Sequence, residues 1–221
     1  MDKVKLAFGA AVVFAVFWGM PAWAGGPSAI VEDLAAPDTG LELMDYVEDG
    51  RIIRLGSSGT ITLGYLRSCW RETISGGTVT VGARRSTIKG GTVRRELVEC
   101  DGGAIELSSA EAGKSGVMVF RRAPSAREAG LPAPQLTLYG ASPVITLIEP
   151  GGNVVIERLD KAGMTIVIAV DGKFVDLAQG KSALEPGGLY RGRVGKRTVV
   201  FKIDPFAQPG AGPIIGRLLH L

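Results

Sequence analysis

The sequence predicts an all-β protein with two small domains after an N-terminal signal peptide. Three observations support this prediction. Helical periodicity is almost absent, short runs rich in Val, Ile, Thr and Leu recur between glycine-containing turns, and a proline-containing segment separates the runs into two groups. With 221 residues, of which 46% are hydrophobic, the chain is long enough to build a core in each group.

The first 24 residues have the pattern of a secretory signal. Lys3 and Lys5 precede an apolar run from Leu6 to Met20, and small residues around one tryptophan lead to Ala24. We therefore predict cleavage after Ala24 and a periplasmic or secreted protein. The alternative is an uncleaved anchor, because an apolar run of about fifteen residues is just short of a comfortable membrane span.

The net charge does not favour a nucleic-acid-binding protein. The formal charge is +3, and loss of Asp2, Lys3 and Lys5 with the signal would reduce it to +2. So small a net positive charge does not supply a broad basic surface.

Basic pairs nevertheless occur in the strand-like part of the chain. We expect Arg84-Arg85 and Arg94-Arg95 to lie mainly on solvated strand faces, because acidic residues such as Glu96 are interleaved with them. The alternative is that Arg84, Arg85, Arg94 and Arg95 form an interaction surface for an anionic glycan, a lipid headgroup or a protein partner.

Two cysteines, Cys69 and Cys100, remain after the signal. In an oxidising compartment such a pair predicts a disulfide, which would stabilise a loop of about thirty residues by roughly 3 to 4 kcal/mol. The alternative is two buried thiols. We expect no metal site, because the chain has no Cys-x-x-Cys pair and only one histidine.

The first β domain is predicted at residues 28–121. Its expected strands are Arg51–Leu55, Thr60–Tyr65, Thr78–Val81, Thr92–Glu99, Ala104–Leu107 and Val117–Phe120. A pseudo-repeat runs through them, in which GTITLG, GTVTVG, GTVRRE and GAIELS alternate apolar and polar residues with the period of a strand. The unequal spacing of the units favours hairpins of a sandwich over a solenoid. We interpret the two GGTV copies, at Gly76 and Gly90, as turns of this repeat.

A linker is predicted at residues 122–134, where the alternation is lost and prolines accumulate. The second domain is predicted at 135–205. Its expected strands are Gln135–Tyr139, Val144–Ile148, Val154–Leu159, Thr165–Val170, Phe174–Asp176, Gly188–Val194 and Arg197–Ile203. Asp171-Gly172 is typical of a two-residue type I′ hairpin turn. Six or seven strands in about seventy residues resemble an immunoglobulin-like sandwich in architecture. Residues 206–221 are expected to form a tail that is frayed apart from one packed turn.

No catalytic motif is complete. The sole histidine, His220, is penultimate in the expected tail, so a Ser-His-Asp triad and a Cys-His pair lack their central residue. Two Gly-Lys-Ser triplets, at Gly113 and Gly180, lack the earlier glycine and the helix of a phosphate loop.

Two other patterns are weak. The Ser86-x-x-Lys89 spacing of penicillin-recognising enzymes stands in strand-like sequence, although it needs a helix to bring its two side chains together. Carboxylates for glycoside hydrolysis remain an alternative, and the local clusters are Asp45 with Glu48 and Asp49, and Glu99 with Asp101.

The stretch from Val47 to Leu107, with EDGRIIRLGSSGTITLGYL leading into SGGTVTVG, resembles the FecR-type periplasmic domain. The likeness is carried by glycines at the strand ends, namely Gly50, Gly56, Gly59, Gly77 and Gly91. The resemblance implies a non-enzymatic sensor or interaction module without catalytic residues. That family often adds a transmembrane helix and a cytoplasmic regulatory segment, which this sequence lacks.

We therefore expect a non-enzymatic periplasmic binding, sensor or scaffold protein that contacts a protein partner or a cell-envelope polymer. We expect no catalytic residues, no cofactor and no transmembrane segment after signal cleavage. Two alternatives remain open, namely an envelope glycan-active enzyme that uses paired carboxylates and a structural subunit of an envelope assembly.

Overall fold

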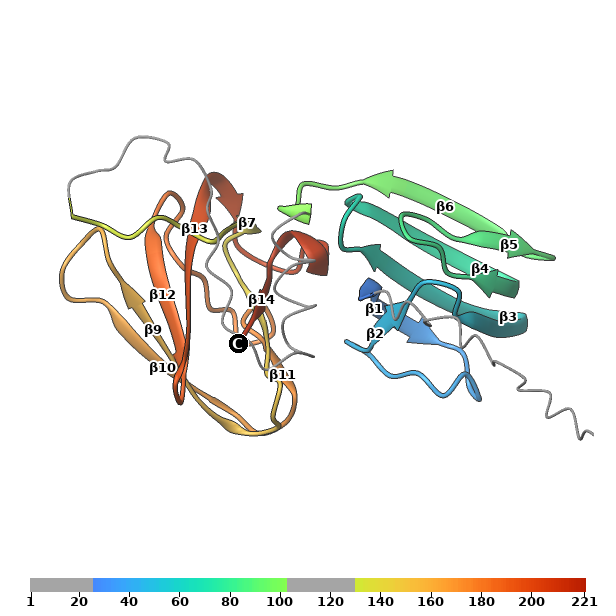
Figure 1. Ribbon diagram of the computed structural model, residues 1–221, viewed down its shortest axis with the longest axis horizontal. Helices are drawn as coiled ribbons and strands as arrows, with labels where there is room; N and C mark the ends of the chain where they lie inside the picture. The colour runs from blue at the N-terminus through green and yellow to red at the C-terminus, as the bar shows by residue number, and fades with distance from the viewer. Residues whose placement is uncertain (1–25, 103–129) are drawn as a thin grey trace, which may run out of the picture.

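The computed structural model describes residues 26–102 and 130–221 and places them in two groups of β-strands (Figure 1). These residues form fourteen strands and one short 3-10 helix, which confirms the all-β fold class. Within the described part of the chain, no helix is both long and apolar enough to cross a membrane. The predicted signal peptide and the expected strands Ala104–Leu107 and Val117–Phe120 lie outside the described residues.

The first group is a six-stranded antiparallel sheet in the order β2-β1-β3-β4-β5, with β6 paired to the first half of β4. Its strands are β1 (Pro27–Ala35), β2 (Tyr46–Glu48), β3 (Ile52–Tyr65), β4 (Trp70–Thr80), β5 (Thr87–Lys89) and β6 (Thr92–Leu97). Ile61, Leu63 and Ile74 are buried in the core that this sheet encloses. Because side chains alternate along a strand, Thr60, Thr62 and Thr73 lie on the opposite face.

Strand β3 is longer than the sequence predicts. Arg51–Leu55 and Thr60–Tyr65 are expected as two strands, but the structure joins them in one strand with register shifts against β4 on both sides of Gly56. Gly56 has a φ of +68°, which a residue with a side chain rarely adopts. The irregularity bends the strand, so that both halves contact the same core.

The two GGTV copies contact each other. The copy at Gly90 forms the turn between β5 and β6, as predicted. The copy at Gly76 lies inside β4, where that strand changes its partner from β6 to β5, so the prediction of a turn there is wrong. A Cβ atom on Gly77 would overlap the carbonyl oxygen of Lys89, and one on Gly91 would overlap the carbonyl oxygen of Gly76. Glycine is required because the two backbones touch.

Substituting Gly77 with alanine is expected to lower the free energy of unfolding by about 3 kcal/mol, through backbone overlap and a positive φ. Gly90→Ala is the matched control, since Gly90 also has a positive φ but has no atom within 4 Å of the place that a Cβ would occupy. Its expected loss is about 1 kcal/mol. Urea denaturation measures both values, and equal losses would show that the backbone contact is unimportant.

The predicted disulfide is present between Cys69 and Cys100, whose Cα atoms are 5.7 Å apart. It connects the turn between β3 and β4 to the chain just after β6. The Cys69 carbonyl oxygen also accepts a hydrogen bond from the Val98 backbone N–H at 3.0 Å. The disulfide therefore reinforces an edge of the first sheet near the point where the described chain leaves it.

The second group consists of two packed sheets, one in the order β10-β9-β12-β13-β7 and one in the order β11-β8-β14. The strands are β7 (Leu136–Gly140), β8 (Val144–Thr146), β9 (Gly152–Arg158), β10 (Thr165–Val170), β11 (Phe174–Asp176), β12 (Leu189–Val194), β13 (Arg197–Gln208) and β14 (Leu218–His220). Leu138, Ile145, Tyr190 and Phe201 are completely buried in the core between them. The likeness to an immunoglobulin sandwich remains a prediction.

The predicted Asp171-Gly172 hairpin is wrong. β10 pairs with β9 in one sheet, whereas β11 pairs with β8 in the other. Neither Asp171 nor Gly172 has a positive φ, so the type I′ turn does not form. Instead, the carbonyl oxygen of Gly172 accepts a hydrogen bond from Gly151 N at 2.9 Å, and the chain crosses between the sheets.

The C-terminal segment is not a frayed tail. β13 continues to Gln208, the 3-10 helix η1 spans Ile214–Gly216, and β14 pairs in parallel with β8. The last residue, Leu221, is 1% exposed, and its N–H donates to the Thr146 carbonyl oxygen at 2.9 Å. The reason is apolar burial, because the alternating residues Leu219 and Leu221 complete the core of the second group.

The same segment joins the two groups. A third buried cluster contains Ile30, Met44 and Leu66 from the first group and Val144, Ile215 and Leu218 from the second. The buried carboxylate of Glu32 in β1 accepts a hydrogen bond from the Ile215 N–H at 2.8 Å. The predicted boundary at 121 and most of the linker predicted for 122–134 lie outside the described residues and remain predictions.

Candidate interaction surfaces

The four arginines predicted as an interaction surface lie on two segments of the first group. Arg84 and Arg85 lie between β4 and β5, whereas Arg94 and Arg95 are neighbours on β6 and point to opposite faces. Arg95 donates from Nε to the Glu72 carboxylate at 2.6 Å and from a second nitrogen to the Ser86 carbonyl oxygen at 3.0 Å. Arg95 therefore has an internal role. An interaction role for the other three remains a prediction.

Ser86 and Lys89 do not form a catalytic pair. The Ser86 hydroxyl is 2.7 Å from the Tyr65 hydroxyl, and the Ser86 N–H donates to the fully buried Glu72 carboxylate at 2.9 Å. Burial raises the pKa of Tyr65 to about 12, so this phenol stays protonated at neutral pH. Lys89 is exposed on β5 opposite Thr78. The network around Ser86 is part of the domain core.

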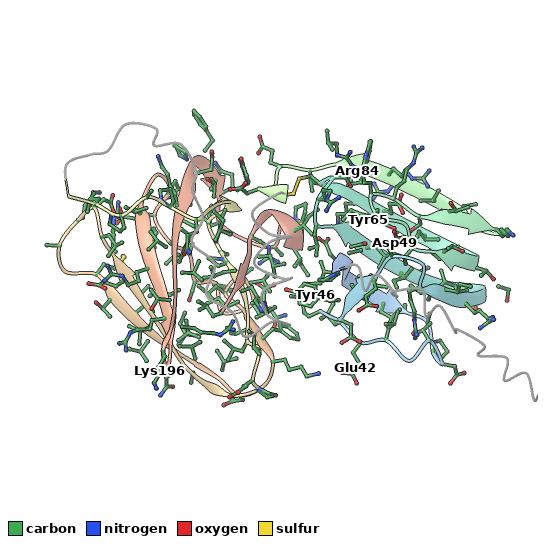
Figure 2. All side chains as sticks on the ribbon, in the orientation of Figure 1. Glu42, Tyr46, Asp49, Tyr65, Arg84 and Lys196 are labelled. Atoms are coloured by element: carbon green, nitrogen blue, oxygen red, sulfur yellow. A yellow bond between two sulfur atoms is a disulfide. The ribbon has the colours of Figure 1, made fainter. Side chains whose placement is uncertain are left out.

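The predicted carboxylate clusters lie in turns and at a contact between the groups. Asp45 accepts a hydrogen bond from Glu42 N at 2.8 Å in the turn before β2, and Glu48 and Asp49 are exposed where β2 ends. Asp101 accepts a hydrogen bond from the Thr137 N–H at 2.9 Å, which links it to β7. Figure 2 shows Glu42 and Arg84 at opposite sides of the first sheet. No group of three His, Cys, Asp or Glu side chains among the described residues is arranged to hold a metal ion.

The triplet Gly180-Lys181-Ser182 lies in a turn between β11 and β12 and is followed by no helix, so it lacks the structure of a phosphate loop. Lys181 is exposed and has a φ of +54°. The triplet at Gly113 falls outside the described residues.

His220 is buried in β14, contrary to the expectation of a mobile tail. Its Nδ1 lies 2.8 Å from the Thr146 hydroxyl and 3.4 Å from the Tyr46 hydroxyl, so it contacts both groups of strands. Its Nε2 is buried and has no hydrogen-bond partner among the residues described. Burial, assisted by the charge of Arg197, lowers the pKa of His220 to about 4. The imidazole is therefore neutral at physiological pH.

This lowered pKa predicts acid sensitivity. In the unfolded chain His220 takes up a proton near its ordinary pKa of about 6.5. The stability associated with the neutral imidazole is therefore complete above pH 6.5 and is lost as the pH falls toward 4, with an upper bound of about 3 kcal/mol. Urea denaturation at pH 7 and pH 5 should show a smaller pH-dependent loss for His220→Asn than for the wild type. An equal loss in both proteins would contradict the prediction.

Among residues 26–102 and 130–221, the second group has an unpaired sheet edge beside an apolar cavity. β10 is the last strand of the five-stranded sheet, and β11 is the last strand of the facing sheet. A cavity of about 650 Å³ lies between them. Its apolar lining includes Ile166, Ile168, Phe174, Val175, Leu177 and Leu184. Both polar main-chain groups and apolar side chains are thus available along one side of the sandwich.

Sequence reasoning missed this edge because it paired β10 with β11 in a hairpin. The signal was nevertheless present in TIVIAV, the sequence of β10, which has no charge, proline or glycine. Val167, at the centre of the strand, is 63% exposed although it is apolar. An apolar residue on an uncharged edge strand indicates an interaction site more strongly than the arginine pairs do.

In comparisons with known proteins, no protein-family model, curated protein or solved structure matches the chain.

Proposed function

We propose that this chain is a non-enzymatic binding or scaffold protein of an extracytoplasmic compartment. In this proposal it binds an extended segment of a protein partner at the free edge of β10. The observation that carries the proposal is the combination of that edge with the apolar cavity beside it. An added strand would receive main-chain hydrogen bonds from β10, and its alternate side chains would enter the cavity.

The arrangement of the acidic residues favours binding over catalysis. Three acidic side chains with little exposure each face an arginine, in the pairs Glu32 with Arg71, Glu72 with Arg95 and Asp176 with Arg217. A glycosidase needs one carboxyl group with a raised pKa close to a second carboxylate in a cleft. The predicted clusters at Asp45 and Asp101 instead hold main-chain N–H groups.

The disulfide and the signal-like N-terminus support an extracytoplasmic compartment. A Cys69–Cys100 disulfide persists in oxidising surroundings such as the periplasm or the extracellular space. The hydrogen bond between Ile215 and Glu32 further suits a scaffold, since it connects the second group, which contains β10, to the first sheet.

Site-specific photo-crosslinking tests the proposal in cells that make the protein. A benzophenone side chain at position 167 is expected to give one discrete adduct, which the additional substitution Ala169→Pro removes. The same side chain at position 206 is the control, because Phe206 is 85% exposed but lies on β13, away from β10. No adduct at position 167, or equal adducts at both positions, would overturn the proposal.

A further inference from the structure

Building on the proposed function, we infer that the partner strand is β10 of a second copy of this chain. Two β10 strands would pair antiparallel about a two-fold axis, so that the five-stranded sheet of one copy continues into that of the other.

The other edge strands of the described residues carry features that discourage strand addition. Four of them, β2, β5, β11 and β14, are only three residues long. β6 carries Arg94, Arg95 and Glu96, and β7 has a register shift against β13. β10 has six residues, no charge, no proline and a regular register with β9. An unprotected edge of this kind is an aggregation hazard unless it is covered by a specific partner.

The direction of the hydrogen bonds in β10 follows from its pairing with β9. The Arg158 N–H donates to the Met164 carbonyl oxygen at 3.0 Å, next to the pair Thr165–Glu157. Because main-chain groups alternate in direction along a strand, Ile166, Ile168 and Val170 bond to β9. The N–H and C=O groups of Thr165, Val167 and Ala169 therefore point to the free edge.

These outward groups make β10 complementary to itself. In an antiparallel pair centred on Val167, each Val167 lies opposite its symmetry mate, and each Thr165 lies opposite an Ala169. No charged residue of either strand opposes a like charge, and Val and Thr suit cross-strand contacts. The pairing therefore satisfies the free main-chain groups without electrostatic repulsion.

The second copy also supplies side chains for the cavity. A two-fold axis perpendicular to the sheet keeps the inner faces of both sheets on the same side, so Ile166 and Ile168 of the second copy extend over the opening beside β11. There they contact the side of the cavity lined by Phe174 and Val175. Six paired residues span about 20 Å. We estimate that the interface buries roughly 1,100 Å² in total, near the lower limit of specific interfaces. Small interfaces are typical of weak association, so we expect a reversible dimer with a Kd of micromolar order.

A charge exchange at position 167 tests the inference by sedimentation velocity between about 1 and 200 μM, a range that brackets a micromolar Kd. The wild-type mature chain is expected to become dimeric across this range. Val167→Lys and Val167→Glu, each alone, should remain monomeric, because like charges face each other across the axis. An equimolar mixture of the two variants should restore dimers.

Thr198→Lys is the control variant, because Thr198 is exposed on β13 and its substitution should leave dimerisation unchanged. Thermal melting of each variant checks that the fold is retained. A wild-type chain that stays monomeric overturns the inference. A wild-type dimer that survives Val167→Lys also overturns it, because the dimer would then use another surface.

The result distinguishes this inference from the function on which it rests. If the wild type is monomeric but position 167 forms an adduct with a different protein, the proposed function stands and the second copy is excluded. If amide exchange shows that Thr165, Val167 and Ala169 are protected in the monomer, the edge is covered within one chain and both proposals fail.

Discussion

Substituting Arg217 with methionine is expected to lower the free energy of unfolding by about 3 to 5 kcal/mol. The Arg217 side chain is 3% exposed and donates two hydrogen bonds to the Asp176 carboxylate, at 2.5 and 2.9 Å. It also donates to the Ser142 carbonyl oxygen at 2.9 Å. Methionine fills a similar volume but leaves Asp176 charged and largely buried without its partner. The cost arises from that uncompensated charge.

Two further variants separate this explanation from a simple loss of packing. The double variant Arg217→Met with Asp176→Asn should recover a large part of the loss, because it removes the stranded charge. Arg193→Met is the control, since Arg193 is exposed on β12 and a surface change of this kind costs at most about 0.5 kcal/mol. Urea denaturation measures all three. A loss below about 1 kcal/mol for Arg217→Met would mean that the buried ion pair contributes little.

Substituting Glu32 with alanine is expected to cost about 3 kcal/mol and to weaken the coupling between the two groups of strands. The Glu32 side chain is 1% exposed, and each of its two oxygens accepts a hydrogen bond from a different group of strands. One accepts from Arg71 Nε at 2.7 Å within the first sheet, and the other accepts from the Ile215 N–H of η1 at 2.8 Å. Alanine leaves that N–H without its acceptor and removes one of two carboxylate partners of Arg71, the other being Glu96.

Calorimetry is the appropriate measurement for the Glu32 prediction. The wild type should unfold in one cooperative transition, whereas Glu32→Ala should broaden or divide it, because the groups then unfold less dependently. Glu32→Gln keeps one oxygen acceptor, so the width of its unfolding transition should lie between those of the wild type and Glu32→Ala. Asp33→Ala, at the exposed neighbouring position on β1, is the control, and its unfolding transition should be close to that of the wild type. A single sharp transition in Glu32→Ala would show that apolar contacts around Ile215 alone couple the groups.

The strand content could be predicted from local sequence. Period-two alternation in segments such as Thr60–Tyr65 indicates strands, because side chains alternate between a buried and a solvated face. The first strand, β1, escaped prediction because five consecutive residues of PSAIVEDLA, Ser28 to Glu32, are buried, two of them polar, so the sequence does not alternate. The first half of β4 escaped it because Arg71 and Glu72 look solvent-facing, although Glu72 is completely buried.

Pairing partners could not be predicted in the same way. Asp171-Gly172 is a strong local signal for a hairpin, yet β10 and β11 belong to different sheets. The local preference of two residues is worth little against the burial of Val170, Leu177 and Leu184 in the core between those sheets. The β10 edge, which is the candidate site, follows directly from that pairing and therefore could not be predicted either.

The environment of each arginine pair could not be predicted from local sequence either. Sequence alone marks Arg94 and Arg95 as equivalent, but only the sheet reveals that Arg95 faces the buried Glu72 while Arg94 faces solvent. The resemblance to the FecR-type domain, with the non-enzymatic role that it implies, is likewise a prediction that awaits a relative or an experiment.

Local sequence patterns were enough to predict the all-β class, several strands of both groups and the Cys69–Cys100 disulfide. These features depend on the alternation of neighbouring residues and on a single pair of thiols. The tertiary structure was needed to show that the final residues up to Leu221 are buried, that Glu32 joins the two groups and that β10 is an edge strand among the described residues. Each of these depends on contacts between residues far apart in the chain, where the burial of apolar surface outweighs local preference.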